Sequence, residues 1–176
     1  FIGGCLTGLL TSYFLNDTSS CVVEARTIGT GVTKNTTAKI TYLQSDIYNK
    51  IKKLTNKENA KLYLNSQIES VKALKNLLEK EEINCDLKET PSYIFTSKKS
   101  KINKLKEEIY FLKKNGIKVS KSPLPIKYKN YSSYKVNDTY TFNPLKFITS
   151  VFEVLNTKNI KVYDNTKVLN VKNDND

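Results

Sequence analysis

The chain has no histidine, no methionine and no tryptophan among its 176 residues, and it has three cysteines. Without histidine, Ser-His-Asp and Cys-His catalytic groups and histidine-ligated metal sites are excluded within this sequence. Cys5, Cys21 and Cys85 are odd in number and widely spaced, which is the pattern of neither a disulfide framework nor a metal site. The sequence therefore indicates no metal site, and it leaves the catalytic residues unknown.

Long apolar runs are also lacking. No stretch approaches the ~18 apolar residues that a membrane-spanning helix needs. The first fifteen residues are apolar and small, but they have neither a basic leader nor a small-residue cleavage site, so we expect no signal peptide. Hydrophobic residues make up 39% of the chain, which is enough for a folded core. We therefore expect a globular, cytoplasmic protein with no membrane span.

Arginine is scarce, although the chain carries a formal net charge of +12. Arginine is the favoured residue for bidentate phosphate and base contacts. The lysines are interleaved with glutamates along predicted helices, as in 98–116, which is typical of a solvated face. We therefore predict no nucleic-acid partner. A basic, noncatalytic binding module remains an alternative, which salt-dependent retention on nucleic acid would reveal.

The first 25 residues have the pattern of a strand, a helix and a second strand. Phe1 and Ile2 indicate the end of a short strand, and residues 5–16 carry an apolar stripe at helical spacing. Residues 19–25 contain the β-branched pair Val22-Val23 and are typical of a strand. This succession predicts a βαβ unit in a parallel sheet, and hence an α/β fold.

The rest of the chain alternates between helical and extended patterns. Residues 25–41 are rich in threonine and lack a period, so we predict a long loop there, and long ordered loops are usually functional. Apolar spacing and turn residues predict helices over 44–54, 58–82, 102–115 and 144–156. Alternating patterns predict strands over 91–97, 117–122, 126–136, 160–165 and 166–173.

Half of the six glycines fall between Gly3 and Gly8, in the turn before the first helix. Such a turn can place a diphosphate on the helix N-terminus, where unpaired N–H groups favour negative charge. Gly3 and Gly8 take the first and third places of the dinucleotide-binding pattern, and Cys5, beside Gly4, takes the second. Glu24 follows the second strand at the spacing of the carboxylate that binds a ribose hydroxyl. The βαβ unit alone leaves NAD(P) and FAD as alternatives.

Several stretches resemble FAD-dependent oxidoreductases of the D-amino-acid oxidase superfamily. They are FIGGCLTGLLTSYFL, CVVEA, IGTGVTKNTTAKIT, YTFNPLKFI and KVYDNTKVLNVK, in the order seen in that family. The sequence is most similar to the bacterial branch around gamma-glutamylputrescine oxidoreductase, some of whose members carry a Rieske domain. The resemblance implies FAD as the cofactor and oxidation of a C–N bond in an amine or amino-acid substrate, with no electron acceptor specified.

The resemblance also implies cofactor-binding residues. The first helix and the carboxylate after the second strand would hold the ADP half of FAD, and the loop that follows would run beside the pyrophosphate toward the flavin. These places correspond to Gly3, Gly4, Gly8, Glu24, Ala25, Arg26, Gly31, Thr36, Thr37, Ala38 and Lys39. The resemblance places Lys39 nearest the isoalloxazine ring, where a cation would stabilise the anionic reduced flavin.

The implied architecture is a Rossmann-like FAD-binding domain with a parallel sheet, interrupted by a smaller α+β segment. Residues 1–84 and 140–176 would form the FAD-binding domain, and residues 85–139 the substrate-domain segment. Two residues depart from the pattern: Cys5 is expected to crowd the pyrophosphate, and Asn143 stands where relatives often have histidine. Because members of the family are considerably longer, we expect this chain to be an incomplete part of one and to be inactive alone.

Overall fold

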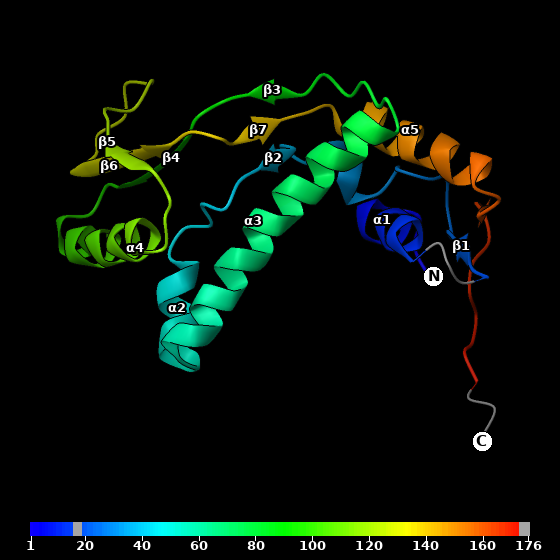
Figure 1. Ribbon diagram of the computed structural model, residues 1–176, viewed down its shortest axis with the longest axis horizontal. Helices are drawn as coiled ribbons and strands as arrows, with labels where there is room; N and C mark the ends of the chain where they lie inside the picture. Colours follow the sequence, from blue (N-terminus) through cyan, green and yellow to red (C-terminus); the bar gives the residue numbers. More distant parts are fainter. Residues whose placement is uncertain (16–18, 173–176) are drawn as a thin grey trace. The chain divides into compact units, whose positions relative to one another are not determined.

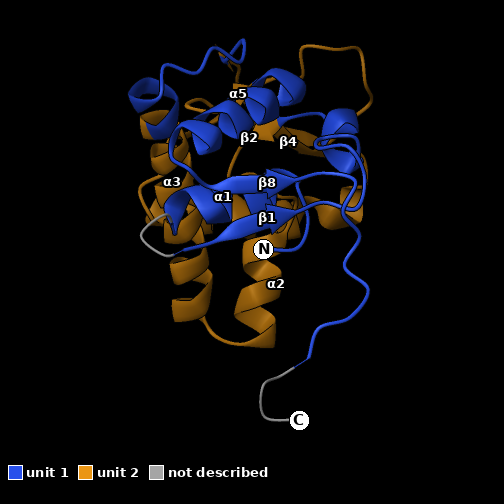
Figure 2. Ribbon diagram, turned by 90° about the vertical axis from the view of Figure 1, so that its right-hand side faces the viewer, with its two compact units in different colours: residues 1–38, 77–87, 142–176 blue, residues 39–76, 88–141 orange. Residues whose placement is uncertain are grey.

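The structure of the chain is a computed structural model that describes residues 1–15 and 19–172 (Figure 1). The chain divides into two compact units, coloured separately in Figure 2. Unit 1 comprises residues 1–38, 77–87 and 142–176, and unit 2 comprises residues 39–76 and 88–141. Each unit is held together by segments that are distant in sequence.

Unit 1 contains the predicted parallel sheet. Strand β1 (Cys21–Val23) pairs in parallel with β8 (Lys161–Tyr163), and Ile2 forms a further parallel bridge with Val23. Helix α1 (Leu6–Phe14) precedes β1, and residue 16 of the predicted helix lies outside the described residues. The 3-10 helix η1 (Val32–Asn35) and helix α5 (Pro144–Thr157) complete this unit. The predicted α/β fold with a parallel sheet is therefore confirmed.

Local chemistry fixes the start of α5. The side chain of Asn143 accepts hydrogen bonds from the backbone N–H groups of Leu145 and Lys146, both at 3.1 Å, and Pro144 occupies the first turn. Asparagine is a strong helix-capping residue, and proline loses no hydrogen bond at this position. Asn143, which departs from the family pattern, thus caps α5. Helix α5 then buries its apolar face in the unit through Phe147, Ile148, Val151 and Leu155.

A polar cluster attaches residues 77–87 to the helices of unit 1. The hydroxyl of Tyr13 on α1 donates a hydrogen bond to Glu81 Oε1 at 2.6 Å. Lys158, at the end of α5, lies 3.2 Å from the same oxygen and over the ring of Tyr13. Burial, together with the Glu81 carboxylate, raises the pKa of Tyr13 to about 12, so the phenol stays protonated.

Unit 2 contains the other helices and two antiparallel sheets. Helix α2 (Ile47–Leu54) is followed by the long helix α3 (Lys57–Lys80), whose residues 57–76 belong to this unit. The side chain of Asn56 accepts from Asn59 N at 2.8 Å and caps the start of α3. One sheet has the order β2 (Lys39–Ile40), β7 (Tyr140–Thr141), β3 (Lys88–Glu89). The other has the order β4 (Ser92–Thr96), β6 (Ser132–Val136), β5 (Val119–Lys121).

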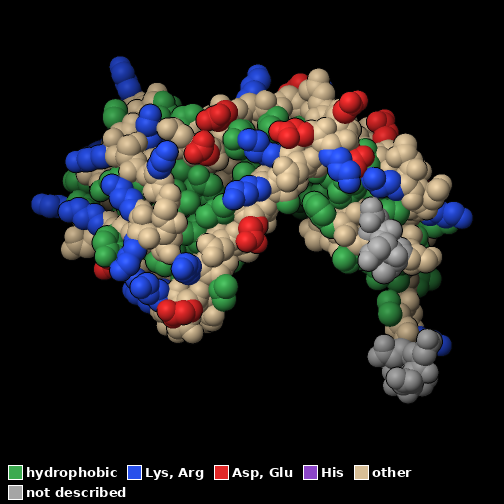
Figure 3. Space-filling view, viewed as in Figure 1, with side chains coloured by type: hydrophobic (Ala, Val, Ile, Leu, Met, Phe, Trp, Pro, Cys, Tyr) green, Lys and Arg blue, Asp and Glu red, His purple; other side chains and the backbone are tan. Residues whose placement is uncertain are grey.

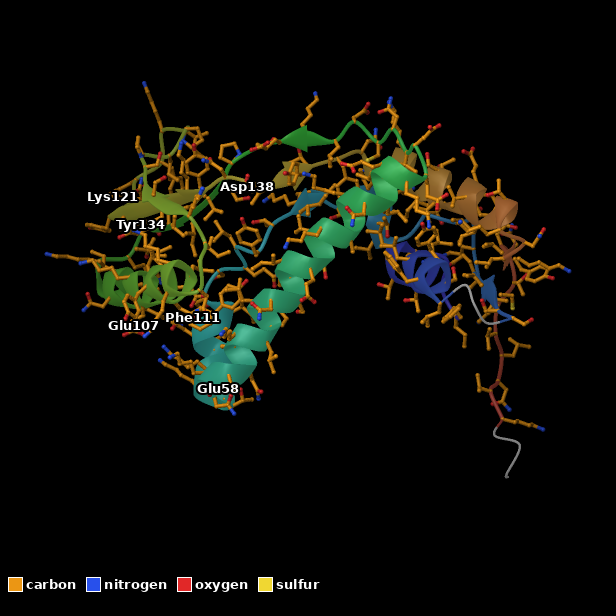
Figure 4. The ribbon with its side chains drawn as sticks, in the orientation of Figure 1. Glu58, Glu107, Phe111, Lys121, Tyr134 and Asp138 are labelled. Atoms are coloured by element: carbon orange, nitrogen blue, oxygen red, sulfur yellow. The ribbon has the colours of Figure 1, made fainter. Side chains whose placement is uncertain are left out.

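The core of unit 2 lies between the second sheet and its helices. The short 3-10 helix η2 (Lys99–Lys101) leads into α4 (Ile102–Lys114). Helix α4 packs on this sheet: Phe111 on α4 belongs to the core cluster and Tyr134 on β6 packs against it. Both residues are labelled in Figure 4. Tyr48 on α2 stacks on Phe111 with ring centroids 5.4 Å apart, and Leu64 on α3 is fully buried in the same cluster. Apolar residues at helical spacing on three helices therefore meet in one core.

Three expectations need correction. Residues 166–172 form no strand, and residue 173 lies outside the described residues; Leu169 and Val171 are largely exposed because no neighbouring strand pairs with them. In the tyrosine-rich stretch only 132–136 is a strand; Tyr131 N still donates to Thr96 O at 2.9 Å, but residues 126–130, which follow two prolines, lie outside the ladder of β4, β6 and β5. The two-residue strands β2, β3 and β7 were not predicted, because so short a segment carries no periodic signal.

The compact units also have different boundaries from the expected domains. Residues 39–76 fall in the same unit as 88–141, whereas the sequence predicted them in the FAD-binding domain. The antiparallel pairing of β2 with β7 and the packing of α2 on α4 bring these segments together. Which segment serves the flavin and which the substrate stays a prediction.

Within the described residues, no helix is long and apolar enough to cross a membrane. The same part of the chain holds no cluster of three or more histidine, cysteine, aspartate or glutamate residues that could bind a metal.

Candidate functional site

The glycine turn of unit 1 is shaped by close backbone approaches. Gly3 has a φ of +109°, a conformation that favours glycine, and its N–H donates to Val23 O at 2.8 Å. A Cβ on Gly4 would lie 2.8 Å from the Cβ of Glu24. A Cβ on Gly8 would lie 1.8 Å from the carbonyl oxygen of Gly3. All three glycines therefore allow α1 to begin directly against the turn that leaves the first strand.

Glu24 lies at the carboxyl end of β1, and its carboxylate is directed at this turn. Its Oε2 accepts a hydrogen bond from Gly4 N at 2.7 Å, and its Oε1 accepts one from Arg26 N at 2.9 Å. These two N–H groups hold the pKa of Glu24 below its ordinary value, so the carboxylate is ionised at neutral pH. A carboxylate has about four acceptor positions, so further hydroxyl donors can still bind it.

Among the described residues, the first turn of α1 receives no side-chain cap from its N-cap residue. Cys5 is the N-cap residue and makes no side-chain cap hydrogen bond, and no acidic residue occupies the first turn. The first N–H groups of a helix have no partner within the helix and favour an anionic group. The uncapped start of α1 suits the diphosphate of a dinucleotide, and the carboxylate of Glu24 beside it suits a ribose hydroxyl. The residues present therefore fit the ADP half of FAD.

The side chain of Cys5 is directed toward the loop after β1. Its Sγ lies 3.2 Å from the point that a Cβ on Gly31 would occupy, and Arg26 Nη2 lies 3.9 Å from the same point. Gly31 thus leaves room for the thiol, and the side chains of Cys5 and Arg26 both lie close to Gly31. The expectation that Cys5 crowds a pyrophosphate stays a prediction.

The predicted loop contains more structure than the sequence indicated. Gly29 has a φ of +74° and faces Ile148 of α5, and the chain then forms η1. Ala25, Thr36 and Thr37 are exposed. These three positions are therefore at the surface of unit 1.

The last two predicted residues of this loop fall in different units. Ala38 is buried in unit 1 with a φ of 45°, and its carbonyl oxygen accepts from Phe142 N at 3.3 Å. Lys39 is exposed and begins β2 in unit 2, opposite Thr141. The structure therefore groups Gly3, Gly4, Gly8, Glu24, Arg26 and Gly31, and it does not place Lys39 with them. Their binding roles stay predictions.

Two contacts of the site were missed from the sequence. Ile28 packs against the glycine turn, since its Cγ1 lies 3.3 Å from where a Cβ on Gly4 would be. After β8, Thr166 N donates to Glu24 O at 2.7 Å, and Asn165 N donates to Arg26 O at 3.1 Å. The isolated apolar Ile28 in a polar loop was a usable signal. The backbone contacts depend on β8 lying beside β1, which no local pattern reveals.

Comparison with known proteins gives several matches of partial length. The chain is 27% identical over 97% of its length to YhfW of Bacillus subtilis (strain 168), whose name describes a Rieske 2Fe-2S iron-sulfur protein, and it covers 34% of that protein. Its fold is similar to glycine oxidase from Geobacillus kaustophilus (TM-score 0.74, 12% identity, 98% of this chain and 48% of the other). It is also similar to L-proline dehydrogenase from P. horikoshii (TM-score 0.71, 17% identity, 95% and 43%).

The chain thus spans about a third of the curated relative and less than half of each of these solved chains. The family model described as FAD dependent oxidoreductase (DAO) matches residues 2–176, which is nearly the whole chain. The glycine turn, the parallel pairing of β1 with β8 and the carboxylate of Glu24 all lie within this match. The chain therefore belongs to the DAO family of FAD dependent oxidoreductases.

Proposed function

We propose that this chain binds the ADP half of FAD through the glycine turn of unit 1 and takes part in the oxidation of a C–N bond in an amine or amino acid. The observation that carries the proposal is the carboxylate of Glu24, held at the carboxyl end of β1 beside the start of α1. When bound, FAD supplies the hydride-accepting chemistry. The residues of this chain bind and orient the cofactor.

The proposed contacts follow from the geometry of unit 1. The start of α1, which lacks a side-chain cap, would receive the diphosphate, and Glu24 would accept from a ribose hydroxyl. Arg26 is exposed beside Cys5 and Gly31, where its charge would add to the attraction for phosphate. The family resemblance further assigns Ala25, Thr36, Thr37, Ala38 and Lys39 to the cofactor, with Lys39 nearest the ring.

The substrate class is proposed from the neighbours in fold. The two similar solved proteins are named glycine oxidase and L-proline dehydrogenase, and both names concern the oxidation of amino acids. The sequence likeness to the branch around gamma-glutamylputrescine oxidoreductase extends the proposal to amines. The Rieske name of YhfW agrees with that branch, some of whose members carry a Rieske domain.

The cofactor proposal is tested by binding FAD to the gene product that contains this chain and to its Glu24→Gln variant. Loss of one carboxylate oxygen removes an acceptor for the ribose, and we expect roughly tenfold weaker FAD binding, within the ~1–3 kcal/mol that losing one partner of a buried hydrogen bond costs. Glu153→Gln removes the same charge from the exposed side of α5 and serves as the matched control.

Titration of FAD fluorescence measures the affinity, and melting without FAD measures the effect on the turn itself. Equal FAD affinity in the Glu24→Gln variant and the parent would contradict the assignment. Binding of NAD(P) in preference to FAD would favour the other dinucleotide.

The reaction is tested in the gene product that contains this chain. Anaerobic addition of glycine, L-proline or a polyamine is expected to bleach the absorbance of bound flavin with at least one of these substrates. For this chain alone we expect no such bleaching. A gene product that retains FAD while no amine or amino acid reduces it would contradict the reaction and leave the cofactor proposal standing.

A further inference from the structure

A polar cavity of about 250 Å³ lies within unit 2, away from the glycine turn in sequence. It is bordered by β4, by the first part of α4 and by the turn that precedes α2. Its charged and hydroxyl side chains include those of Ser45, Asp46, Lys98, Lys101, Lys104 and Glu108. All three basic residues lie within residues 98–104, so one short segment supplies the positive charge that borders the cavity.

The two carboxylates of this cavity are already engaged by the protein. Asp46 pairs with Lys104 and, at 3.2 Å, with Lys50, and these cations hold the pKa of Asp46 well below its ordinary value. Glu108 is 1% exposed, and its two oxygens accept from the backbone N–H groups of Tyr48 and Asn49. Asp46 is therefore paired with lysines other than Lys98 and Lys101, and both oxygens of Glu108 are directed at the backbone of α2.

Lys98 and Lys101 are exposed and make no ion pair within the described residues. The turn that carries Lys98 is fixed, because the Thr96 hydroxyl accepts from Lys98 N and donates to Lys98 O, both at 3.2 Å. Lys98 and Lys101 thus border the cavity without an ion pair of their own in the described part of the chain. A bound anion would relieve their mutual repulsion.

The surrounding charge increases the attraction for anions. Unit 2 has 21 basic and seven acidic residues, a formal net charge of +14, whereas unit 1 has eight basic and ten acidic residues. Figure 3 shows lysine side chains gathered over the part that holds α4, β5 and β6. Such a one-signed surface concentrates anions from solution. The positive charge of the chain is therefore a property of unit 2.

We propose that this cavity binds a phosphate group, free or as the monoester of a small molecule. Lysine binds phosphate as a point charge, and two unpaired lysines match a dianion better than a single carboxylate. The hydroxyl of Ser45 and the exposed Ser97 add polar groups at the rim. The volume lies below the ~300–1,000 Å³ of drug-sized ligand sites, so the ligand is smaller than a nucleotide.

The test is calorimetric titration of the chain with inorganic phosphate, methyl phosphate and succinate at low salt. We expect saturable binding of phosphate, weakened about tenfold in the double variant Lys98→Gln/Lys101→Gln. The matched control Lys106→Gln/Lys113→Gln removes two exposed lysines of α4 that do not border the cavity. This control is expected to weaken binding by less than about threefold, through screened long-range charge alone.

Amide chemical shifts locate the bound ion, with the largest changes expected at residues 96–98. Binding of methyl phosphate as tight as that of phosphate identifies an ester as the ligand, and its rejection identifies free phosphate. Absence of saturable binding, equal losses in the two double variants, or succinate binding as tight as phosphate would each overturn the proposal. Because the four substitutions replace exposed lysines, the fold is expected to persist, and circular dichroism checks this.

Discussion

Replacing Gly8 with alanine is expected to destabilise unit 1 by about 3 kcal/mol or more, the upper range for forcing an atom into a packed site. The new Cβ would lie 1.8 Å from the carbonyl oxygen of Gly3 and 3.1 Å from its carbonyl carbon. Both are backbone atoms, and the N–H of Gly3 donates a hydrogen bond to Val23 O. The backbone at Gly3 therefore has little freedom to move away from the new Cβ. Helix propensity alone predicts the opposite sign, because alanine within α1 would stabilise the helix by about 1 kcal/mol.

Thermal and urea unfolding, followed by circular dichroism, measure this difference. Gly31→Ala is the matched control, because its Cβ would meet the ends of two side chains that can move away, Cys5 Sγ at 3.2 Å and Arg26 Nη2 at 3.9 Å. We expect Gly31→Ala to change the free energy of unfolding by less than about 1 kcal/mol. A Gly8→Ala variant as stable as the parent would show that α1 does not approach the turn so closely.

Removing the carboxylate of Glu108 is expected to destabilise unit 2 by about 2–4 kcal/mol, since two buried N–H groups lose their acceptors. Glu108 on α4 accepts from Tyr48 N at 3.0 Å and Asn49 N at 2.9 Å, in the first turn of α2. The N-cap residue of α2, Asp46, makes no side-chain cap bond of its own. Glu108 thus caps a helix to which it does not belong.

The measurement compares Glu108→Ala with Glu107→Ala. Glu107 is the exposed neighbour on the same helix, labelled in Figure 4, and its replacement is expected to change stability by less than about 0.5 kcal/mol. Equal free energies of unfolding for the two variants would contradict the capping role of Glu108.

The pH dependence of Glu108 provides a second readout. Burial raises the pKa of Glu108 above its ordinary value of 4.5, so the folded chain binds this proton more tightly than the unfolded chain. Its contribution to stability is fully present below pH 4.5 and is lost as the pH rises through the raised pKa. The stability advantage of the parent over Glu108→Gln is therefore expected to shrink as the pH rises. An advantage that grows with pH would contradict the raised pKa.

The sequence by itself determined the local elements of unit 1 and most of the helices. A glycine turn, an apolar stripe and a β-branched pair predicted the βαβ unit and placed Glu24 at the end of its second strand. These signals depend on neighbours a few residues apart, which backbone sterics and helical spacing fix without tertiary contacts. The burial of Glu108 was also indicated by the sequence, because Glu108 falls three residues after Leu105 and four before Leu112, on the apolar face of α4.

Only the tertiary structure decided which distant segments pair. The pairing of β1 with β8, the sheet of two-residue strands and the cap that Glu108 gives to α2 all join residues more than 40 positions apart. Residues 166–172 likewise have apolar residues suited to a strand, but no strand within the described residues pairs along them, so Leu169 stays exposed. A strand is stable only when its backbone groups find a neighbour, and the choice of that neighbour rests on nonlocal packing, which no local pattern encodes.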